Sequence, residues 1–310
     1  MEDRKITVVG AGTMGRGIAQ LLAQHYVNVH MVEQNQTILG EAKEKIRGQY
    51  EILREYEFIT EHEMNEALGR ISLSDSLQDA QNSWMVIEAI PEVLELKQTL
   101  FQTLEEFCGP ATIFATNTSG LSINQISVQL MHRERFIGTH FFMPAAIIPL
   151  VEVIRGDETS NQVCDEVMQF FKKIHKEPVL IQKDIPGFIG NRIQHAMARE
   201  AISLLEEGIA TAEEIDTVVR WSLGVRLLFT GPLEQRDLNG LDVHHHIASY
   251  LYKDLENRTE PSRLLSEKVQ NGELGTKTGK GFYDWDKDSQ AAALQMKNAQ
   301  LLQLMKWIRK

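Results

Sequence analysis

The chain has 310 residues, of which 43% are hydrophobic and 24% charged, and its formal net charge is -11 at pH 7. That length suits about two domains with their own cores, and the acidic balance argues against a nucleic-acid partner, because such proteins usually carry basic surfaces. With two cysteines, no apolar run of the roughly 18 residues that a membrane helix needs, and no signal peptide, we expect a cytoplasmic protein without a membrane partner.

The first half of the chain alternates short β-branched or apolar runs with helical patterns. This alternation predicts a doubly wound α/β fold, in which crossover helices connect the strands of a mostly parallel sheet. Between about residues 37 and 70, a charged insertion is predicted to form a helical hairpin, and its second arm begins at a capping box of Thr60 and Glu63. The predicted strands are 6–10, 27–33, 84–90, 112–117, 135–142 and 179–183.

A glycine-rich turn follows the first predicted strand. VVGAGTMGRG has the G-x-G-x-x-G order between a strand and a helix, which allows a tight turn, close approach of a pyrophosphate, and packing of the helix on the strand. Glu33 ends the second strand, where a carboxylate can accept hydrogen bonds from ribose hydroxyls and repel the extra phosphate of NADP. A purely structural turn is the alternative for such a motif alone, but strand, helix and Glu33 in register favour an NAD site in a Rossmann-type domain. Its predicted cofactor-binding residues are Gly10, Gly12, Thr13, Met14, Gly15 and Glu33.

The pattern changes after the last predicted strand, where Pro and Gly interrupt the chain. Apolar residues at helical spacing then predict a helix that ends near Gly208. A second capping box, Thr211 with Glu214, begins another helix. We therefore expect a Rossmann-type domain over 1–184 and an all-α domain over 185–310.

The stretch GTHFFMPAAIIPLVEVI places His140 at the end of a predicted strand and Glu152 among apolar residues. An NAD enzyme that oxidises an alcohol needs a base for the hydroxyl proton, and histidine suits this role because its ordinary pKa is near neutrality. A neighbouring carboxylate would orient the imidazole and stabilise its charged form. Glu152 would be costly among apolar neighbours without such a partner. From the residues alone, a satisfied structural histidine remains the alternative.

Over about residues 4 to 285 the chain resembles the L-3-hydroxyacyl-CoA dehydrogenase family. The matching segments, in chain order, are VVGAGTMGRGIAQ, VIEAIPEVLELKQTLF, NTSGLSI, GTHFFMP, LVEVI, DIPGFIGNRI and GTKTGKGFYDW. The resemblance implies an NAD-dependent oxidoreductase that acts on a CH–OH group and has a short L-3-hydroxyacyl-CoA, such as 3-hydroxybutyryl-CoA, as its substrate. It also implies a Rossmann domain followed by a helical domain through which a homodimer forms.

The resemblance assigns catalytic roles to four residues of this sequence. His140 matches the catalytic base, and Glu152 matches its carboxylate partner. Ser119 matches the serine that hydrogen-bonds the reacting oxygen of the substrate, and Asn191 matches the asparagine that positions substrate beside the histidine. The alternatives are that Ser119 only caps the following helix and that Asn191 is a surface helix residue.

Three further residues are expected near the cofactor. Glu92 and Lys97 match family residues that hold the nicotinamide ribose, and Asn117 precedes the serine motif. The alternatives are a solvated charge for Lys97 and a helix cap for Asn117. We expect no metal, because the adjacent histidines 244–246 would point in different directions on a helix.

The sequence departs from the acyl-CoA pattern around the histidine. Met143 stands where that pattern has asparagine, Ile148 and Pro149 replace methionine and lysine, and Gly120 replaces a second serine. The IIPLVEV form is more similar to relatives that act on small free hydroxy acids, including L-gulonate 3-dehydrogenase with lambda-crystallin, L-carnitine dehydrogenase and a pyridoxine-breakdown dehydrogenase. A free hydroxy acid or alcohol is therefore the alternative substrate, and an NAD-binding structural or sensing protein without turnover is a second alternative.

Overall fold

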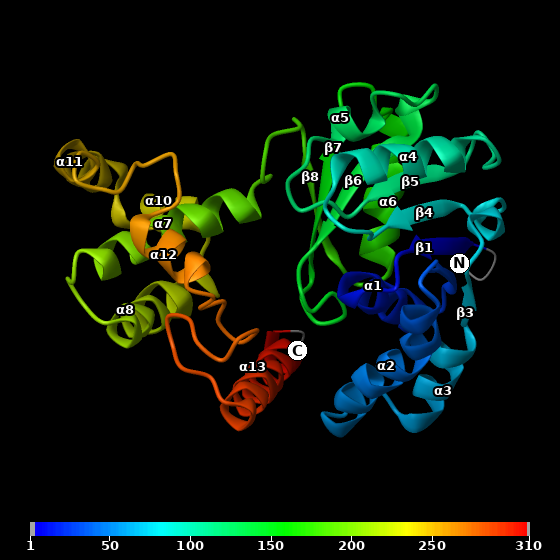
Figure 1. The fold of residues 1–310 in the computed structure, drawn as a ribbon. Helices are drawn as coiled ribbons and strands as arrows, with labels where there is room; N and C mark the ends of the chain where they lie inside the picture. The colour runs from blue at the N-terminus through cyan, green and yellow to red at the C-terminus, as the bar shows by residue number, and fades with distance from the viewer. Residues whose placement is uncertain (1–3, 309–310) are drawn as a thin grey trace. The chain divides into compact units, whose positions relative to one another are not determined.

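The computed structural model describes residues 4–308, and eight of their strands form one sheet in the order β3-β2-β1-β4-β5-β6-β7-β8 (Figure 1). Neighbouring strands are parallel except for the antiparallel pair β6 and β7. The predicted doubly wound, mostly parallel sheet is confirmed. The strands are β1 (Lys5–Val9), β2 (Asn28–Val32), β3 (Ile71–Ser74), β4 (Met85–Glu88), β5 (Ile113–Thr116), β6 (Phe136–Phe141), β7 (Leu150–Arg155) and β8 (Glu177–Ile181).

Two of these strands, β3 and β7, were not among the predicted ones. β3 is a four-residue strand at the edge of the sheet, and its sequence ISLS carries too few apolar residues to stand out. β7 is a short apolar segment that follows β6 after a proline-containing loop and returns beside it. Its register with β6 places Glu152 directly opposite His140, so the strand that the sequence did not reveal determines the geometry of the site.

Helices cover both faces of the sheet. One core contains residues of α1, of the helical hairpin α2–α3 and of α6, together with Ile6 and Val8 of β1. The other contains residues of α4 and α5, together with Val9 of the same strand. The two cores lie on opposite faces because successive side chains of a strand alternate. These helices are α1 (Thr13–Gln24), α2 (Gln36–Glu55), α3 (Glu61–Gly69), α4 (Leu94–Glu105), α5 (Ile123–Ser127) and α6 (Asn161–Lys173), with short 3₁₀ segments η1 (Leu77–Ala80) and η2 (Arg133–Arg135).

Both predicted capping boxes are present. The Thr60 hydroxyl accepts from the Glu63 amide at 3.2 Å, and the Glu63 carboxylate accepts from the Thr60 amide at 2.8 Å. Thr211 and Glu214 repeat this arrangement at the start of α8. Each pair satisfies two amides that have no partner within their helix.

The elements that the structure describes beyond residue 184 are all helical, as predicted. Gly208 lies just beyond α7 with a φ of 70°, the left-handed conformation that commonly ends helices. Helices α8 to α11 and the intervening π-helical segment bury none of their residues. These elements are α7 (Gly190–Glu206), α8 (Ala212–Val218), η3 (Val219–Gly224), α9 (Val225–Leu227), α10 (Pro232–Asn239), α11 (Leu241–Leu251), α12 (Arg263–Gln270) and α13 (Lys287–Ile308).

The described chain divides into two compact units. Residues 4–192 and 298–308 form the first unit, and residues 193–297 form the second. The first therefore includes the last turns of α13, where Leu302 and Met305 are buried in the core that contains α1. Our division of the chain at residue 184 stays a prediction. No helix within residues 4–308 is both long and apolar enough to cross a membrane.

Candidate active site

The predicted site residues of the first unit gather at the carboxyl ends of its parallel strands. Gly10 follows β1, Glu33 follows β2, Glu92 follows β4 and Ser119 follows β5. Ligands of open α/β sheets bind at this edge, in the crevice where the strand order reverses. Here the order reverses between β1 and β4, beside the glycine turn.

The glycine turn has the geometry that close approach of a dinucleotide requires. Gly10 has a φ of +100°, and a Cβ there would lie 2.6 Å from the carbonyl oxygen of Ala89. A Cβ on Gly15 would lie 1.8 Å from the carbonyl oxygen of Gly10. By contrast, a Cβ on Gly12 would meet no protein atom within 4 Å, so this position is open to a ligand. Thr13, which is exposed, then begins α1, and Met14 is half-buried beside it.

The Glu33 carboxylate is hydrogen-bonded to the glycine turn. Its Oε2 accepts from the Ala11 amide at 3.0 Å, and its Oε1 accepts from the Asn35 amide at 2.9 Å. Because each carboxylate oxygen has two lone pairs, both oxygens can still accept a ribose hydroxyl. The open Gly12 backbone, the amides at the start of α1 and this carboxylate together fit NAD.

His140 and Glu152 form a buried hydrogen-bonded pair. Nδ1 of His140 lies 2.8 Å from Oε2 of Glu152, and the two residues are 5% and 2% exposed. An ionised carboxylate can only accept, so Nδ1 carries the proton and Nε2 of the neutral ring keeps its lone pair. The imidazole packs against the rings of Phe142 and Phe188, with centroids 4.6 and 5.8 Å away. This arrangement fixes the ring with a basic nitrogen available.

The second oxygen of Glu152 is held by the start of α7. Oε1 accepts from the amides of Ile189 and Gly190 at 3.0 and 2.8 Å. Burial alone would raise the pKa of Glu152, but the hydrogen bond to His140 and these amides outweigh it, and the pKa lies below its ordinary value. Glu152 therefore stays ionised at neutral pH and can stabilise a charged imidazole.

Ser119 and Asn191 are also joined. The side-chain amide of Asn191 donates to the Ser119 carbonyl at 2.8 Å, while the neighbouring Gly190 binds Glu152. The first turn of α7 thus connects the His140–Glu152 pair with the segment that contains Ser119. Ser119 is exposed, and its hydroxyl forms no hydrogen bond within residues 4–308.

The helix-capping alternative for Ser119 and Asn117 is wrong. Ser122 caps α5, and its hydroxyl accepts from the Gln125 amide at 3.2 Å. Asn117 is buried, and its Oδ1 accepts from the Phe141 amide at 2.9 Å. This bond ties the end of β5 to the end of β6.

Lys97 is not a solvated charge, because it is only 1% exposed. Its ammonium lies 2.5 Å from Oε1 of Glu88 and 3.2 Å from Oε2 of Glu92. Glu92 is more open, and its Oε1 accepts from the Thr118 hydroxyl and the Ser119 amide at 2.5 and 2.8 Å. Burial alone would raise the pKa of Glu92, but the Thr118 hydrogen bond and the Lys97 charge lower it.

Two parts of this arrangement were missed in the sequence. Glu88 was not singled out, although a carboxylate within the apolar run WMVIEAI needs a partner if that strand is buried. The amides of Ile189 and Gly190 were also missed, because backbone donors leave no signal in residue type.

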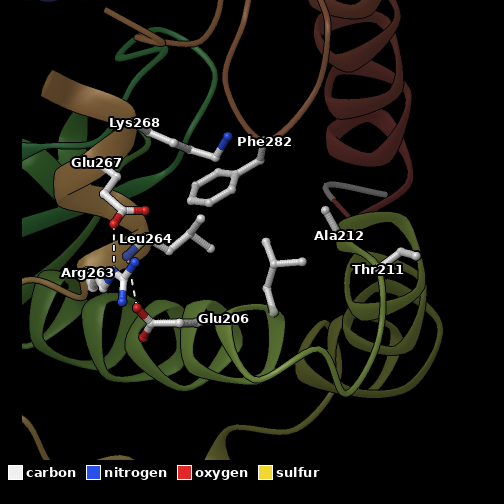
Figure 2. A pocket seen from close by; sticks show the side chains of 9 residues that line it. Glu206, Thr211, Ala212, Arg263, Leu264, Glu267, Lys268 and Phe282 are labelled. Carbon is white, nitrogen blue, oxygen red and sulfur yellow. Dashed lines mark hydrogen bonds and ion pairs between the residues drawn. The ribbon is translucent and has the colours of Figure 1, made fainter. Parts of the chain in front are cut away.

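A hollow of about 590 Å³ on the second unit contains none of the predicted site residues. Figure 2 shows that α7, α12 and the start of α8 contribute to its lining, with Phe282 on one side. Its charged side chains already have partners: Glu206 pairs with Arg258, Arg263 with Glu267, and Lys268 with Glu273. We therefore do not assign the chemistry to this hollow.

Relatives of the chain include two kinds of dehydrogenase. It is 38% identical over 287 residues to a probable 3-hydroxybutyryl-CoA dehydrogenase of Bacillus subtilis, covering 92% of this chain and 99% of the relative. It is 31% identical over 300 residues to 5-formyl-3-hydroxy-2-methylpyridine 4-carboxylate 5-dehydrogenase of Mesorhizobium japonicum, covering 96% of both chains.

Similar solved structures belong to the same two kinds of dehydrogenase. A crystal structure of the pyridine-carboxylate dehydrogenase, described as an NAD+-dependent dismutase, superimposes with a TM-score of 0.92 at 29% identity, covering 99% of this chain and 98% of that one. The (S)-3-hydroxybutyryl-CoA dehydrogenase of Ralstonia eutropha gives a TM-score of 0.77 at 36% identity, covering 92% and 99%.

Two family models match the chain in sequence. The NAD binding domain of 3-hydroxyacyl-CoA dehydrogenase matches residues 5–185, and the C-terminal domain of the same family matches residues 187–285. Together with the geometry of the glycine turn, these matches identify NAD as the cofactor of an oxidoreductase that acts on a CH–OH group. The chain belongs to the 3-hydroxyacyl-CoA dehydrogenase family.

Proposed function

We propose that this protein interconverts a short L-3-hydroxyacyl-CoA, of the 3-hydroxybutyryl-CoA type, and its 3-oxo form. The observation that carries the proposal is the His140–Glu152 pair, which lies at the carboxyl edge of an NAD-binding sheet. The Bacillus subtilis and Ralstonia eutropha relatives, both named for 3-hydroxybutyryl-CoA, support this substrate class.

The contacts support the following proposed roles for the side chains. NAD, when bound, supplies the hydride acceptor. Nε2 of His140 takes the hydroxyl proton, and Glu152, held ionised by the α7 amides, stabilises the imidazolium that results. Ser119 offers a free hydroxyl to the reacting oxygen. Asn191 positions the substrate, and its side-chain amide also holds the backbone of Ser119 in place by donating to the Ser119 carbonyl. In the reverse direction the same imidazolium returns the proton.

A small free hydroxy acid or alcohol is a second candidate substrate, and a specific observation favours it. Helix α13 lies beyond residue 285, where the family match ends. The pyridine-carboxylate dehydrogenase covers 99% of this chain, whereas the Ralstonia enzyme covers 92%. Met143, which follows strand β6 and is 62% exposed, also departs from the acyl-CoA pattern.

One assay distinguishes these candidates. NADH oxidation is measured with acetoacetyl-CoA, and NAD reduction is measured with carnitine, gulonate and a pyridine-carboxylate alcohol. The proposal expects turnover of acetoacetyl-CoA with a kcat/KM at least about tenfold above that of any free acid. Turnover restricted to free acids would replace it with the second candidate, and binding of NADH without turnover of any compound would favour a sensing or structural protein.

We further propose that the protein forms a homodimer through its helical unit and works in the cytoplasm. Large apolar side chains of that unit stand exposed, and a surface of this kind is typical of a protein interface. They include Trp221 at 78%, Phe229 at 63%, Leu233 at 81% and Tyr252 at 72% exposure. Light scattering should give twice the 35.3 kDa chain mass, and a monomer would contradict the dimer. The free thiols of Cys108 and Cys164 suit a reducing compartment.

A further inference from the structure

The proposed catalytic pair lies close to the loop that connects β6 and β7. The last paired residues of the two strands are Phe141 and Val151. His140 and Glu152 form the pair immediately before them, so one residue pair separates them from the connecting loop, residues 142–149. The end of a hairpin opens more readily than its middle. The hydrogen bond between the imidazole and the carboxylate therefore depends on what holds this loop.

A buried lysine next to the loop holds its backbone. Lys176, just before β8, is 3% exposed. Its ammonium donates to the carbonyls of Ala145 and Ile148 at 2.5 and 2.6 Å. The next residue, Glu177, donates from its amide to the Pro149 carbonyl at 3.0 Å. Two consecutive residues at the start of β8 thus hold three carbonyls of the loop.

The side chains of the loop are packed on its other side. Ala145 and Ile147 are 3% and 8% exposed and belong to the core that contains α1. A Cβ on Gly17 of α1 would lie 3.3 Å from Cβ of Ala145, so the loop and this helix are in close contact. Apolar packing has little direction, whereas hydrogen bonds from a charged donor are directional and stronger than neutral ones. Lys176 is therefore the contact that defines the path of the loop backbone.

We propose that Lys176 is a positioning residue for the His140–Glu152 pair. By holding the carbonyls of Ala145 and Ile148, its ammonium keeps the end of the β6–β7 hairpin closed and the imidazole bonded to the carboxylate. It acts through the loop, because its ammonium is buried against backbone carbonyls rather than directed at a ligand. This inference rests on the proposed role of the pair in proton transfer.

The test compares three single variants of the full-length protein. Lys176→Met keeps the apolar stem and removes the donors, and Lys176→Gln restores an amide donor on a shorter side chain. The matched control is Arg135→Met. Arg135 is also a buried cation, 4% exposed, and donates to the carbonyls of Gly109 and Thr112. It precedes β6, at the end of that strand away from the loop.

The first measurement is amide hydrogen exchange without cofactor or substrate, so that a direct contact of Lys176 with either cannot contribute. Peptides that cover the loop ends of β6 and β7 should exchange about tenfold faster in Lys176→Met than in the wild type, because the hairpin opens there more often. Lys176→Gln should lie between the two. Arg135→Met should leave these peptides unchanged. Wild-type exchange at the loop ends in a folded Lys176→Met protein would overturn the inference.

The second measurement is a double-mutant cycle on kcat with Glu152→Ala, which removes the acceptor of the imidazole. Lys176→Met should lower kcat roughly tenfold in the wild-type background, with the Kd for NADH unchanged. In the Glu152→Ala background it should change kcat less than about twofold, because residues that act through one bond are not additive. Equal effects of Lys176→Met in both backgrounds would show that it does not act through the pair.

The outcomes separate failure of the inference from failure of the proposed function. If Glu152→Ala lowers kcat but Lys176→Met keeps the wild-type kcat, Lys176 is not a positioning residue and the role of the pair stands. If Glu152→Ala keeps the wild-type kcat, the role of the pair is wrong and the inference falls with it. If Arg135→Met lowers kcat as much as Lys176→Met, a general loss of structure explains the effect and the inference is overturned. If Lys176→Met does not fold, Lys176→Gln decides by the same measurements.

Discussion

His140 and Glu152 face each other across the antiparallel pair β6–β7, and a hydrogen bond of 2.8 Å joins them. The carboxylate is held at its other oxygen by the amide of Gly190. The orientation of the imidazole is therefore determined by two strands and by the first turn of α7.

The first prediction concerns the lack of a side chain at Gly190. A Cβ there would lie 2.5 Å from Cζ of Phe142, whose ring packs on His140. Gly190→Ala should therefore displace the ring and the imidazole, lower kcat at least about tenfold, and destabilise the fold by about 1–3 kcal/mol. Steady-state kinetics and chemical denaturation would measure both effects.

A helical glycine elsewhere gives the matched control. At Gly48 in α2 an added Cβ would meet nothing within 4 Å. Gly48→Ala should leave kcat unchanged and stabilise the fold by about 0.5–1 kcal/mol. Wild-type kinetics in Gly190→Ala would show that the contact with Phe142 does not position the histidine.

The second prediction concerns the pH dependence of stability. The folded-state pKa of Glu152 lies below the ordinary value of 4.5. A carboxyl with a depressed pKa contributes stability that is fully present above its ordinary pKa and is lost as the pH falls through the folded value. The free energy of unfolding of the wild type should therefore exceed that of Glu152→Gln throughout the range from pH 6 to 8. The difference should shrink only below about pH 4.5, and a difference that already declines between pH 7 and 6 would refute the depressed pKa.

The third prediction concerns cofactor choice. The carboxylate of Glu33 accepts from the Ala11 and Asn35 amides, and in its proposed role at the ribose it would repel an added phosphate. Glu33→Ala should lower kcat/KM for NAD and raise the NADP-to-NAD ratio of kcat/KM by roughly tenfold or more. Glu44→Ala, at a side chain that is 81% exposed on α2, should not change this ratio. Unchanged selectivity in Glu33→Ala would exclude the proposed role.

The sequence allowed much of the fold to be predicted. Apolar runs, the glycine order and capping boxes are local patterns, and the doubly wound sheet and both boxes were confirmed. The edge strand β3 and the returning strand β7 were missed. A four-residue edge strand and a short apolar return carry little periodicity, and their pairing depends on residues distant in the chain.

The site was less accessible from the sequence. The pairing of His140 with Glu152 was anticipated, because a carboxylate among apolar residues requires a partner and the family resemblance assigns His140 to it. The partner of Lys97 was not, since nothing in the spacing shows that its helix places the ammonium beside Glu88. The amides that hold Glu152 belong to residue types without donors in their side chains, so only the backbone path of α7 reveals them.

The most direct test of the account is His140→Gln, measured by kcat and by NADH titration on the same preparation. Glutamine keeps a polar side chain in the ring's place but supplies no base of suitable pKa. The account predicts that kcat falls by roughly a hundredfold or more while the Kd for NADH stays nearly unchanged. A variant that turns over at a near-normal rate would contradict the assignment of His140 as the proton acceptor.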